Sequence, residues 1–262
     1  MNRLLGIGFA VVLGALAFVV PFLTPDPNGT EYGAKLAAPS WAHLLGTDQA
    51  GRDVLARIAA GTWVSLGTAL LVAVITFAVG LAIGLLAAVA GGVVDTVISR
   101  VIDVTLAVPQ LVLALAIVGV LGPGHANLVL AMSVAGWAHL ARFARAFATQ
   151  QTEKPFVIAS RMAGVGRWRS AARHVMPATA TGVLAVATLH IGEIVLSLAG
   201  LSFLGLGVAP PTAEWGQMVA EARGYVDRAP WLVLAPAVAV LISVAAASLL
   251  GDALQDKGKR WP

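Results

Sequence analysis

Six stretches of this chain contain no Asp, Glu, Lys or Arg, and each is about as long as a membrane crossing. They are Leu4–Pro25, Ile58–Val94, Val104–Ala141, His174–Gly192, Ile194–Ala213 and Ala229–Gly251, with lengths of 22, 37, 38, 19, 20 and 23 residues. A helix needs roughly 20 apolar residues to cross a bilayer. Charged residues make up 11% of the chain, against roughly 25% in soluble domains. The sequence therefore predicts an all-α, polytopic membrane protein with about six transmembrane helices.

Glycine and proline divide the longest run. Gly122-Pro123-Gly124 is a turn signal that a helix interior would not keep, so the 38-residue run is predicted to hold the end of one helix and the start of the next. The 37-residue run has no such break, and two crossings with a turn need more than about 40 residues. It predicts one helix over residues 62–89. Within it, Gly80 and Gly84 favour close helix packing, inside the chain or between chains.

The C-terminal half predicts two more crossings. Glu193 separates two uncharged runs, and we place it inside a fifth helix over residues 178–201. Residues 202–230 contain prolines and charged residues, which is typical of an external or re-entrant segment. The sixth crossing is predicted over residues 231–251, followed by a cytoplasmic tail, 252–262.

The N-terminal region predicts a membrane anchor and an external segment. Arg3 precedes an apolar stretch that is longer than the roughly 7–15 residues of a secretory signal core, and no small-x-small cleavage site follows it. Residues 1–23 are therefore interpreted as a transmembrane anchor helix. Residues 24–61 are interpreted as an external segment with an amphipathic helix, and residues 62–251 as the transmembrane core.

The distribution of positive charge predicts that both ends of the chain are cytoplasmic (N-in, C-in). Cytoplasmic loops are enriched in Lys and Arg. With the N-terminus inside, the cytoplasmic side holds 12 of the 17 Lys and Arg residues, seven of them in residues 142–177. The net charge of +4 is thus interpreted as a topology signal. We expect membrane lipid around the chain and no nucleic-acid partner.

Motifs for catalysis and nucleotide binding are absent from the sequence. It contains no Gly-x4-Gly-Lys-Ser/Thr phosphate loop, no His-Glu-x-x-His pair, no Gly-x-Ser-x-Gly elbow and no cysteine. We therefore expect a chain that is not an enzyme and that holds no metal ion and no cofactor of its own.

Three ionisable residues are candidates for a role inside the membrane. His190 and Glu193 share one face of the fifth helix because they are three residues apart, and an ionisable group at membrane depth suggests a function. They could form a proton relay, contact a transition metal, or make a paired polar contact toward a partner subunit or a wet cavity. Asp103 follows Arg100 at the same spacing, where a structural role is expected.

Residues 142–177 form the main cytoplasmic feature that the sequence predicts. Within them, residues 156–164 predict a short helix with a small exposed face, Val165-Gly166 predict a break, and the basic residues from Arg167 predict a second helix up to Pro177. A solvated basic loop would have the same composition. A short helix with Ala and Ser on its surface could instead dock into a groove of another protein.

This segment resembles the EAA loop of permease subunits of ABC importers. The family pattern is Glu-Ala-Ala-x3-Gly-x9-Ile-x-Leu-Pro. This chain aligns with it through Ile158, Ala159, Ser160, Gly164, His174, Met176 and Pro177. The glutamate of the pattern is replaced by Ile158.

Two further segments are similar to signatures of the C-type permeases of dipeptide, oligopeptide and nickel importers. These are His43–Arg57, and Leu201–Pro211 followed by Trp215-Gly216. Asp103 with Pro109 resembles the third-helix pattern of that family. The resemblance covers about residues 40–255.

The resemblance implies a type I importer fold and a permease subunit that moves a solute inward in the bacterial cytoplasmic membrane. It implies a homologous second permease subunit, two cytoplasmic ATP-binding subunits that hold ATP and Mg²⁺, and an external solute-binding protein that contacts residues 24–61 and 202–230. Residues expected to couple the chain to the ATPases are Ile158, Ala159, Ser160, Arg161, Gly164 and Pro177. Polar residues expected along the pore are His190, Glu193 and Asp103.

The sequence leaves the cargo open. Di- or oligopeptides are favoured, and nickel or another metal complex is the alternative, because its histidine or carboxylate ligands could lie on a delivery protein. A proton-coupled carrier that uses His190 and Glu193 is a rival from another class. The family usually has a glutamate where this chain has Leu198, and an Asp-Pro-Arg ending that this chain lacks.

Overall fold

The computed structural model describes the backbone of residues 2–258 and the side chains of residues 5–251. In this part of the chain the regular secondary structure is helical, apart from an isolated bridge between Thr47 and Asp53, and turns and irregular segments connect the helices. The α-helices are α1 (Asn2–Phe18), α2 (Val20–Leu23), α3 (Val54–Ala90), α4 (Gly92–Ala107), α5 (Gln110–Leu121), α6 (His125–Thr152), α7 (Pro155–Met162), α8 (Arg167–Ser170), α9 (Met176–Phe203), α10 (Trp215–Ala222) and α11 (Trp231–Gly258). Short 3-10 turns lie at Tyr32–Ala34 and Arg223–Tyr225, and a π-helical turn lies at Ala171–Val175.

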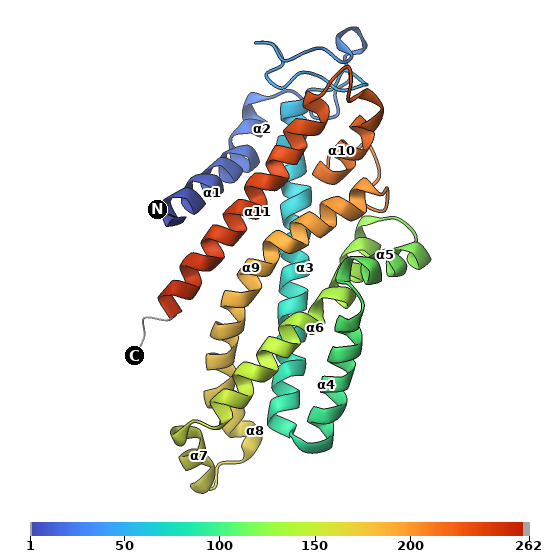
Figure 1. The fold of residues 1–262 in the computed structure, drawn as a ribbon. Coiled ribbons are helices and arrows are strands. Elements are labelled where there is room, and N and C mark those ends of the chain that lie inside the picture. Colours follow the sequence, from blue (N-terminus) through green and yellow to red (C-terminus); the bar gives the residue numbers. More distant parts are fainter. Residues whose placement is uncertain (1, 259–262) are drawn as a thin grey trace.

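Helix α3 is the central element, against which α6 and α9 pack (Figure 1). It begins at Val54 because the Asp53 carboxylate accepts a hydrogen bond from the Ala56 N–H at 2.9 Å, which caps the helix. It ends at Ala90, and the next residue, Gly91, has a φ of +63°. A single helix is what the uninterrupted run predicts, but it starts earlier than residue 62. Within residues 24–61, the helical residues are a 3-10 turn at Tyr32–Ala34 and the first turns of α3.

Glycines allow α3 and α6 to approach closely. A Cβ added to Gly80 would lie 2.8 Å from Leu140 Cβ, and one added to Gly84 would lie 2.6 Å from the Ala141 carbonyl oxygen. Such distances leave no room for a side chain. Of the two possibilities for this small-residue pair, packing within the chain is the one observed.

The structure supports fewer crossings by length and composition than the sequence predicts. Within the described residues, three helices are long and apolar enough to cross a membrane: Val54–Ala90, Arg167–Phe203 and Trp231–Gly251. A fourth is present if α4 and α5 form one broken span. Helix α1 is shorter, and α6 is less apolar. Six crossings with both ends inside therefore stay a prediction.

Proline bends the predicted third helix. Helices α4 and α5 meet at 85°, and Val108, at the bend, is extended with φ −96° and ψ +129°. The residue before a proline avoids the helical region, so Pro109 explains the break. The Gly122-Pro123-Gly124 turn lies between α5 and α6 as predicted.

The second helix of the predicted cytoplasmic loop does not end at Pro177. Helix α8, the π-helical turn and α9 form one continuous helix, Arg167–Phe203. Pro177 is tolerated near the start of α9 because the preceding turn takes a π-helical rather than a regular α-helical course. A movement of α8 would therefore pass directly into α9.

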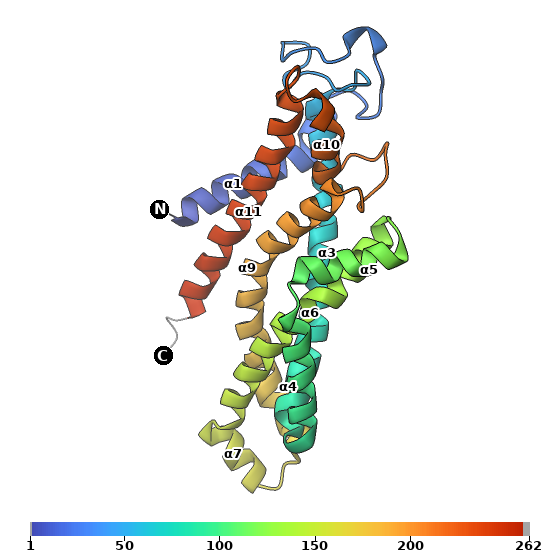
Figure 2. The ribbon, with the colours of Figure 1, turned by 45° about the vertical axis from the view of Figure 1, so that its right-hand side comes forward.

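The molecule has two distinct ends, which we name the α7 end and the α10 end (Figures 1 and 2). The α7 end carries α7, α8 and the start of α4. The α10 end carries α10 and residues 24–53. Helices α1 and α11 pack side by side, and Gly6 lies against Leu249. Helix α11 continues to Gly258, so it includes part of the predicted tail, 252–262, whose last four residues lie outside the described chain.

Candidate functional site

Helix α7 is held at the α7 end by one buried side chain. Val157 is 2% exposed and packs with Ala148, Ala171 and Val175, against hydrophobic residues near the end of α3. Arg167 donates a hydrogen bond to the Ala90 carbonyl at 3.1 Å. The short helix is thus attached both to the end of α3 and to the root of α9.

The other face of α7 is apolar and uncovered. Phe156, Ile158 and Met162 are 53%, 46% and 84% exposed, and Trp168 of α8 is 51% exposed. The sequence predicts a small exposed face, and this is wrong because the larger side chains of α7 also point outward. Exposed apolar patches rimmed by polar groups mark protein contacts. Helices α7 and α8 also carry three exposed arginines: Arg161, Arg167 and Arg169.

The remaining residues of the predicted coupling set have different positions. Ala159 and Arg161 are exposed on α7 beside Ile158, and Ser160 is half-buried. Pro177 is exposed near the start of α9. The structure therefore gathers Ile158, Ala159 and Arg161 on one short helix, with Pro177 in a different element.

Gly164 closes α7 through its backbone. Its φ is +87°, and an added Cβ would meet nothing within 4 Å. The Gly164 N–H bonds to the Arg161 carbonyl at 3.0 Å, and the Val165 N–H bonds to the Ser160 carbonyl at 3.2 Å. These two bonds form a Schellman motif, which places glycine at the left-handed position. Gly164 thus fixes where α7 stops.

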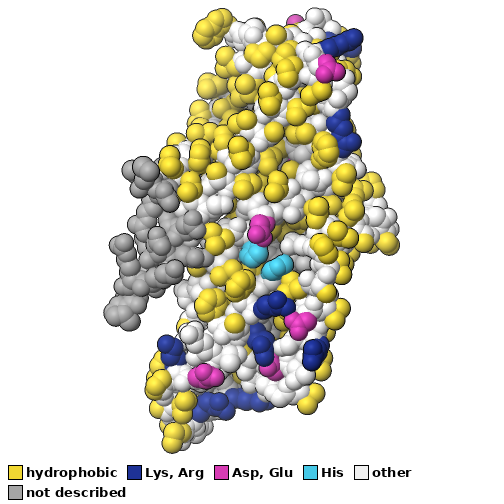
Figure 3. Space-filling view, in the orientation of Figure 1, with side chains coloured by type: hydrophobic (Ala, Val, Ile, Leu, Met, Phe, Trp, Pro, Cys, Tyr) yellow, Lys and Arg dark blue, Asp and Glu magenta, His cyan; other side chains and the backbone are white. Residues whose placement is uncertain are grey.

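Ionised side chains pair between α4 and α6. Arg142 donates to Asp103 at 2.6 Å, with both side chains 55% exposed. One turn nearer the α7 end, Arg145 makes two hydrogen bonds to Asp95. Asp103 is the only one of these four that the sequence analysis selected as a pore candidate. Figure 3 shows charged and histidine side chains across the lower part of one face, while hydrophobic side chains cover most of its upper half.

His190 and Glu193 form the pair that their spacing predicts. His190 Nδ1 lies 2.7 Å from Glu193 Oε2, and the two side chains are 17% and 71% exposed. The ring of His139, on α6, lies 5.6 Å from the His190 ring. His139 was not predicted from the sequence to lie near this pair. The one sequence feature that pointed to it is its position one turn before Arg142.

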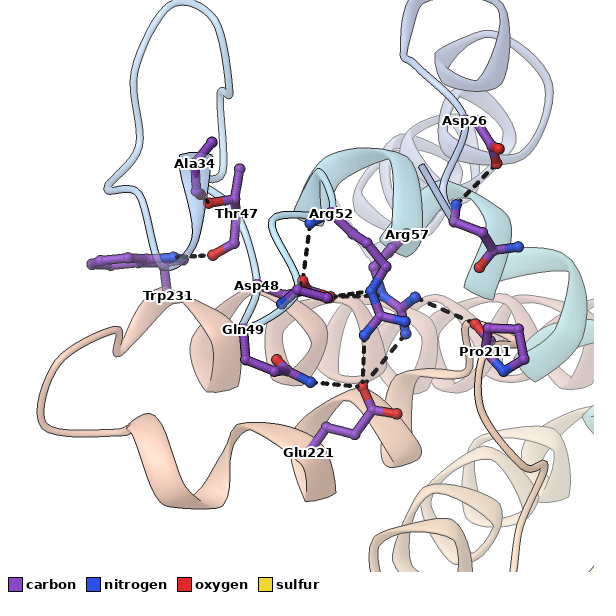
Figure 4. A network of polar contacts seen from close by, with 12 residues as sticks. Asp26, Ala34, Thr47, Asp48, Gln49, Arg52, Arg57, Pro211, Glu221 and Trp231 are labelled. Atoms are coloured by element: carbon purple, nitrogen blue, oxygen red, sulfur yellow. Dashed lines mark hydrogen bonds and ion pairs between the residues drawn. The ribbon is translucent and has the colours of Figure 1, made fainter. Parts of the chain in front are cut away.

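A second ionic cluster joins distant segments at the α10 end (Figure 4). Arg57 is 1% exposed, and its guanidinium lies 3.5 Å from Asp48 and 3.6 Å from Glu221. Arg52 bridges the same two acids at 2.6 and 3.3 Å. Arg57 also donates to the Pro211 carbonyl at 3.3 Å. The cluster fixes residues 24–53 to α10. Asp48, Arg52 and Arg57 belong to the segment His43–Arg57 that resembles the family signature, but their contacts with Glu221 were not predicted from the sequence.

Helix α10 is also tied to α3. The buried Glu214 carboxylate caps α10 by accepting the Gly216 and Gln217 N–H groups at 3.1 and 2.9 Å. It also accepts the Ser65 hydroxyl at 3.1 Å. Trp215 is fully buried and donates to the Ile58 carbonyl at 3.1 Å. Residues 202–230 are therefore a structured part of the protein body.

These features define a helical membrane protein with a short helix exposed at one end and an ordered cap at the other. The family model of binding-protein-dependent transport system inner membrane components matches residues 80–259, and the chain belongs to this family. The nickel transport system permease protein of Escherichia coli K12 is 39% identical over 90% of this chain and 85% of its own. The dipeptide transport system permease protein of the same strain is 39% identical over 97% of this chain and 87% of its own.

Solved structures agree on the fold. A chain of the inward-facing MetNI methionine ABC transporter has a TM-score of 0.63 at 18% identity, covering 76% of this chain and 95% of its own. A chain of an amino acid ABC transporter with histidines gives 0.61 at 19% identity, covering 77% and 94%. The protein is thus a permease subunit of an ABC importer and a multi-pass component of the cytoplasmic membrane.

Proposed function

We propose that this permease carries di- or oligopeptides inward, paired with a homologous permease and driven by two ATP-binding subunits. The observation that carries the proposal is α7, whose outer face leaves Met162 84% exposed although its inner face is buried by Val157. A partner that covers this face would remove apolar surface from water, which is favourable by roughly 25 cal/mol per Å². ATP and Mg²⁺ are held by those partners.

The connection from α7 into the membrane supports coupling. Val157 packs with Ala171 and Val175, which belong to the continuous helix that becomes α9. A push on α7 would therefore move α9, and with it His190 and Glu193, without any nucleotide site in this chain. This gives the predicted coupling residues a mechanical role.

The proposed orientation places the α7 end in the cytoplasm. The basic residues of segment 142–177 favour that side. The α10 end, with residues 24–53 and 202–230, then faces outward and receives the solute-binding protein. The ordered ionic cluster around Arg57 would give that protein a fixed surface.

Substitution of Met162 tests the docking surface. In the co-expressed transport system, Met162→Glu is expected to reduce recovery of the ATP-binding subunits with the tagged permease by about tenfold, since a charge buried in a contact costs more than about 1.4 kcal/mol. Val93→Glu is the control, because Val93 is 79% exposed on α4 and lies outside α7. Equal recovery from both variants would remove α7 as the docking helix.

Co-purification tests the composition of the complex. The tagged chain should bring two ATP-binding subunits and a second permease, identified by mass spectrometry. A chain that purifies alone and still supports uptake, with uptake abolished by a protonophore, would instead favour a proton-coupled carrier. Membership of the ABC importer family supports the first outcome.

Nickel is the second candidate cargo, because the nickel and dipeptide permeases of one organism are equally similar to this chain, at 39% identity each. Uptake of labelled dialanine and of ⁶³Ni²⁺ by cells producing the whole system separates the two. We expect dialanine uptake that excess unlabelled dipeptide competes away and nickel does not. Nickel uptake without peptide uptake would reverse the assignment.

A further inference from the structure

Ionisable groups on α4, α6 and α9 form one continuous track on the face shown in Figure 3. From the α7 end it passes through the Arg145–Asp95 pair and the Arg142–Asp103 pair. It continues on α6 to His139, which is three residues before Arg142. The ring of His139 lies 5.6 Å from the ring of His190. His190 then contacts Glu193 at 2.7 Å.

The track stops at Glu193. Beyond it, α9 has no charged residue up to Phe203, and α6 has none between His125 and His139. Helix α5, which follows α4 after the 85° bend, has none either. Glu193 lies 17 residues from the start of α9, or about 25 Å along the axis at 1.5 Å per residue. The row of ionisable groups therefore extends from the α7 end to about the middle of the molecule, where it stops. We call this second point its closed end.

The exposure of these groups is incompatible with contact to lipid. Glu193 is 71% exposed, and Arg142 and Asp103 are 55% exposed each. A single charged side chain facing lipid at the centre of a membrane costs roughly 2.5–3.5 kcal/mol or more. Several such groups in a row need water or a polar partner. Because the row reaches the α7 end without interruption, water can enter from that end.

Oppositely charged side chains pair between α4 and α6 along the track. Arg142 pairs with Asp103, and Arg145 pairs with Asp95. Among the described residues, the one ionic partner of Glu193 is His190. No Lys or Arg in the described part of the chain makes a salt bridge with the Glu193 carboxylate. Glu193 and His190 also line a small cavity with Thr76 and Gln110.

We propose that the track lines the water-filled inner half of the transport path and that Glu193, oriented by His190, binds a positively charged group of the cargo at its closed end. The group is the ammonium of a peptide or a divalent metal cation. A carboxylate accepts strong hydrogen bonds from an ammonium, and a carboxylate with an imidazole suits transition-metal ions. This inference rests on the proposed transport function and adds a site to it.

Labelling of a thiol introduced at Gln110 tests whether water reaches the closed end of the track and whether Glu193 is charged there. The chain has no cysteine, so Gln110→Cys introduces its only thiol. In inverted vesicles containing the whole complex, we expect membrane-impermeant reagents to reach this thiol, and the cationic reagent to be favoured over the anionic one. Glu193→Gln should lower that rate ratio about tenfold, the size expected for one nearby unit charge in a wet site, and Glu193→Asp should keep it.

Leu241→Cys is the matched control, because Leu241 is 67% exposed in the uncharged part of α11 and should not react. No reaction at Gln110→Cys in the complex would mean that a partner subunit covers the track. An unchanged rate ratio in Glu193→Gln would mean that its charge does not act there. Either result overturns the inference. Neither measurement depends on which cargo is transported. The inference about the track can therefore be wrong while the proposed transport function is right, and the reverse.

Uptake identifies the cation. We expect Glu193→Gln to reduce uptake of either dialanine or ⁶³Ni²⁺ about tenfold, as for the loss of one charge-assisted contact, and Glu193→Asp to restore part of it. The probe whose uptake falls in Glu193→Gln shows whether the bound cation is a peptide ammonium or a metal ion. Uptake of N-acetyl-dialanine, which lacks the ammonium, should be the same in Glu193→Gln and in the wild-type protein. Unchanged uptake of a transported cationic probe in Glu193→Gln would overturn the binding role.

Discussion

At the scale of single residues, Gly164 is needed for its backbone conformation, although its exposed position suggests a role in contact with a partner. The family pattern has glycine at this position, and an exposed glycine suggests a tight contact with a partner. The structure shows open space around it and a φ of +87°, so the position is explained by the end of α7. Gly166, two residues later, is also in open space but has a φ of −57°.

This difference predicts different effects of the same substitution. Gly164→Ala should destabilise the end of α7 by about 1–2 kcal/mol, because a side chain disfavours the left-handed region, while Gly166→Ala should have little effect. Hydrogen–deuterium exchange of the α7 amides in the purified complex measures this. Faster exchange in Gly164→Ala alone is the expected result. Equal exchange in both variants would show that the Schellman bonds do not hold the helix end.

At the scale of elements, the contact between α3 and α6 positions the site. His139 and Arg142 lie on α6 at the level where Gly80 and Gly84 of α3 contact Leu140 and Ala141. The close approach brings these side chains of α6 beside α9 and α4. Packing in membranes depends on such contacts because the lipid provides no hydrophobic drive between helices.

Overpacking this contact should be costly. Gly84→Ala is expected to lower the stability of the purified complex by about 1–3 kcal/mol, since the new Cβ would lie 2.6 Å from both the Ala141 carbonyl and Ala144 Cβ. Gly67→Ala on the same helix is the control, because its added Cβ meets nothing within 4 Å. Thermal unfolding followed by Trp fluorescence reports both variants. A lower midpoint for Gly67→Ala than for Gly84→Ala would contradict this account of the packing.

At the scale of the whole molecule, ionic contacts bind residues 24–53 to the helical body. Arg57 directly precedes the 37-residue uncharged run, and its partners Asp48 and Glu221 come from residues 24–53 and from α10. Buried ions of this kind are costly when one partner is removed. The cap at the α10 end, which residues 24–53 form with α10, therefore depends on the contacts among residues 24–53, the start of α3 and α10.

Loss of Arg57 should loosen the cap. Arg57→Met is expected to destabilise it by about 3 kcal/mol, since the buried acids lose one of their two cations. Protease added to the outside of intact spheroplasts should then cut residues 24–53 faster than in the wild-type protein. Arg228→Met, at an exposed position near the same end, should leave the rate unchanged. If Arg57→Met is as resistant to the protease as Arg228→Met, Arg52 alone is sufficient to hold residues 24–53 against α10.

The sequence by itself predicted the elements whose cause is local. Uncharged runs predicted a helical membrane protein, the unbroken run predicted one long α3, and Gly122-Pro123-Gly124 predicted the turn before α6. The i, i+3 spacing predicted the contact of His190 with Glu193, because both residues belong to one helix. The bend at Pro109 was missed, although the local conformational effect of proline on Val108 was available from the sequence.

Only the tertiary structure decided which charged residues meet. Arg142 pairs with Asp103 across 39 positions, and Arg52 pairs with Glu221 across 169. Such contacts depend on where helices cross and how far each is rotated, which is determined by packing at positions such as Gly84 rather than by the charged residues themselves. For the same reason, the outward face of α7 and the place of His139 beside His190 emerged only from the folded chain.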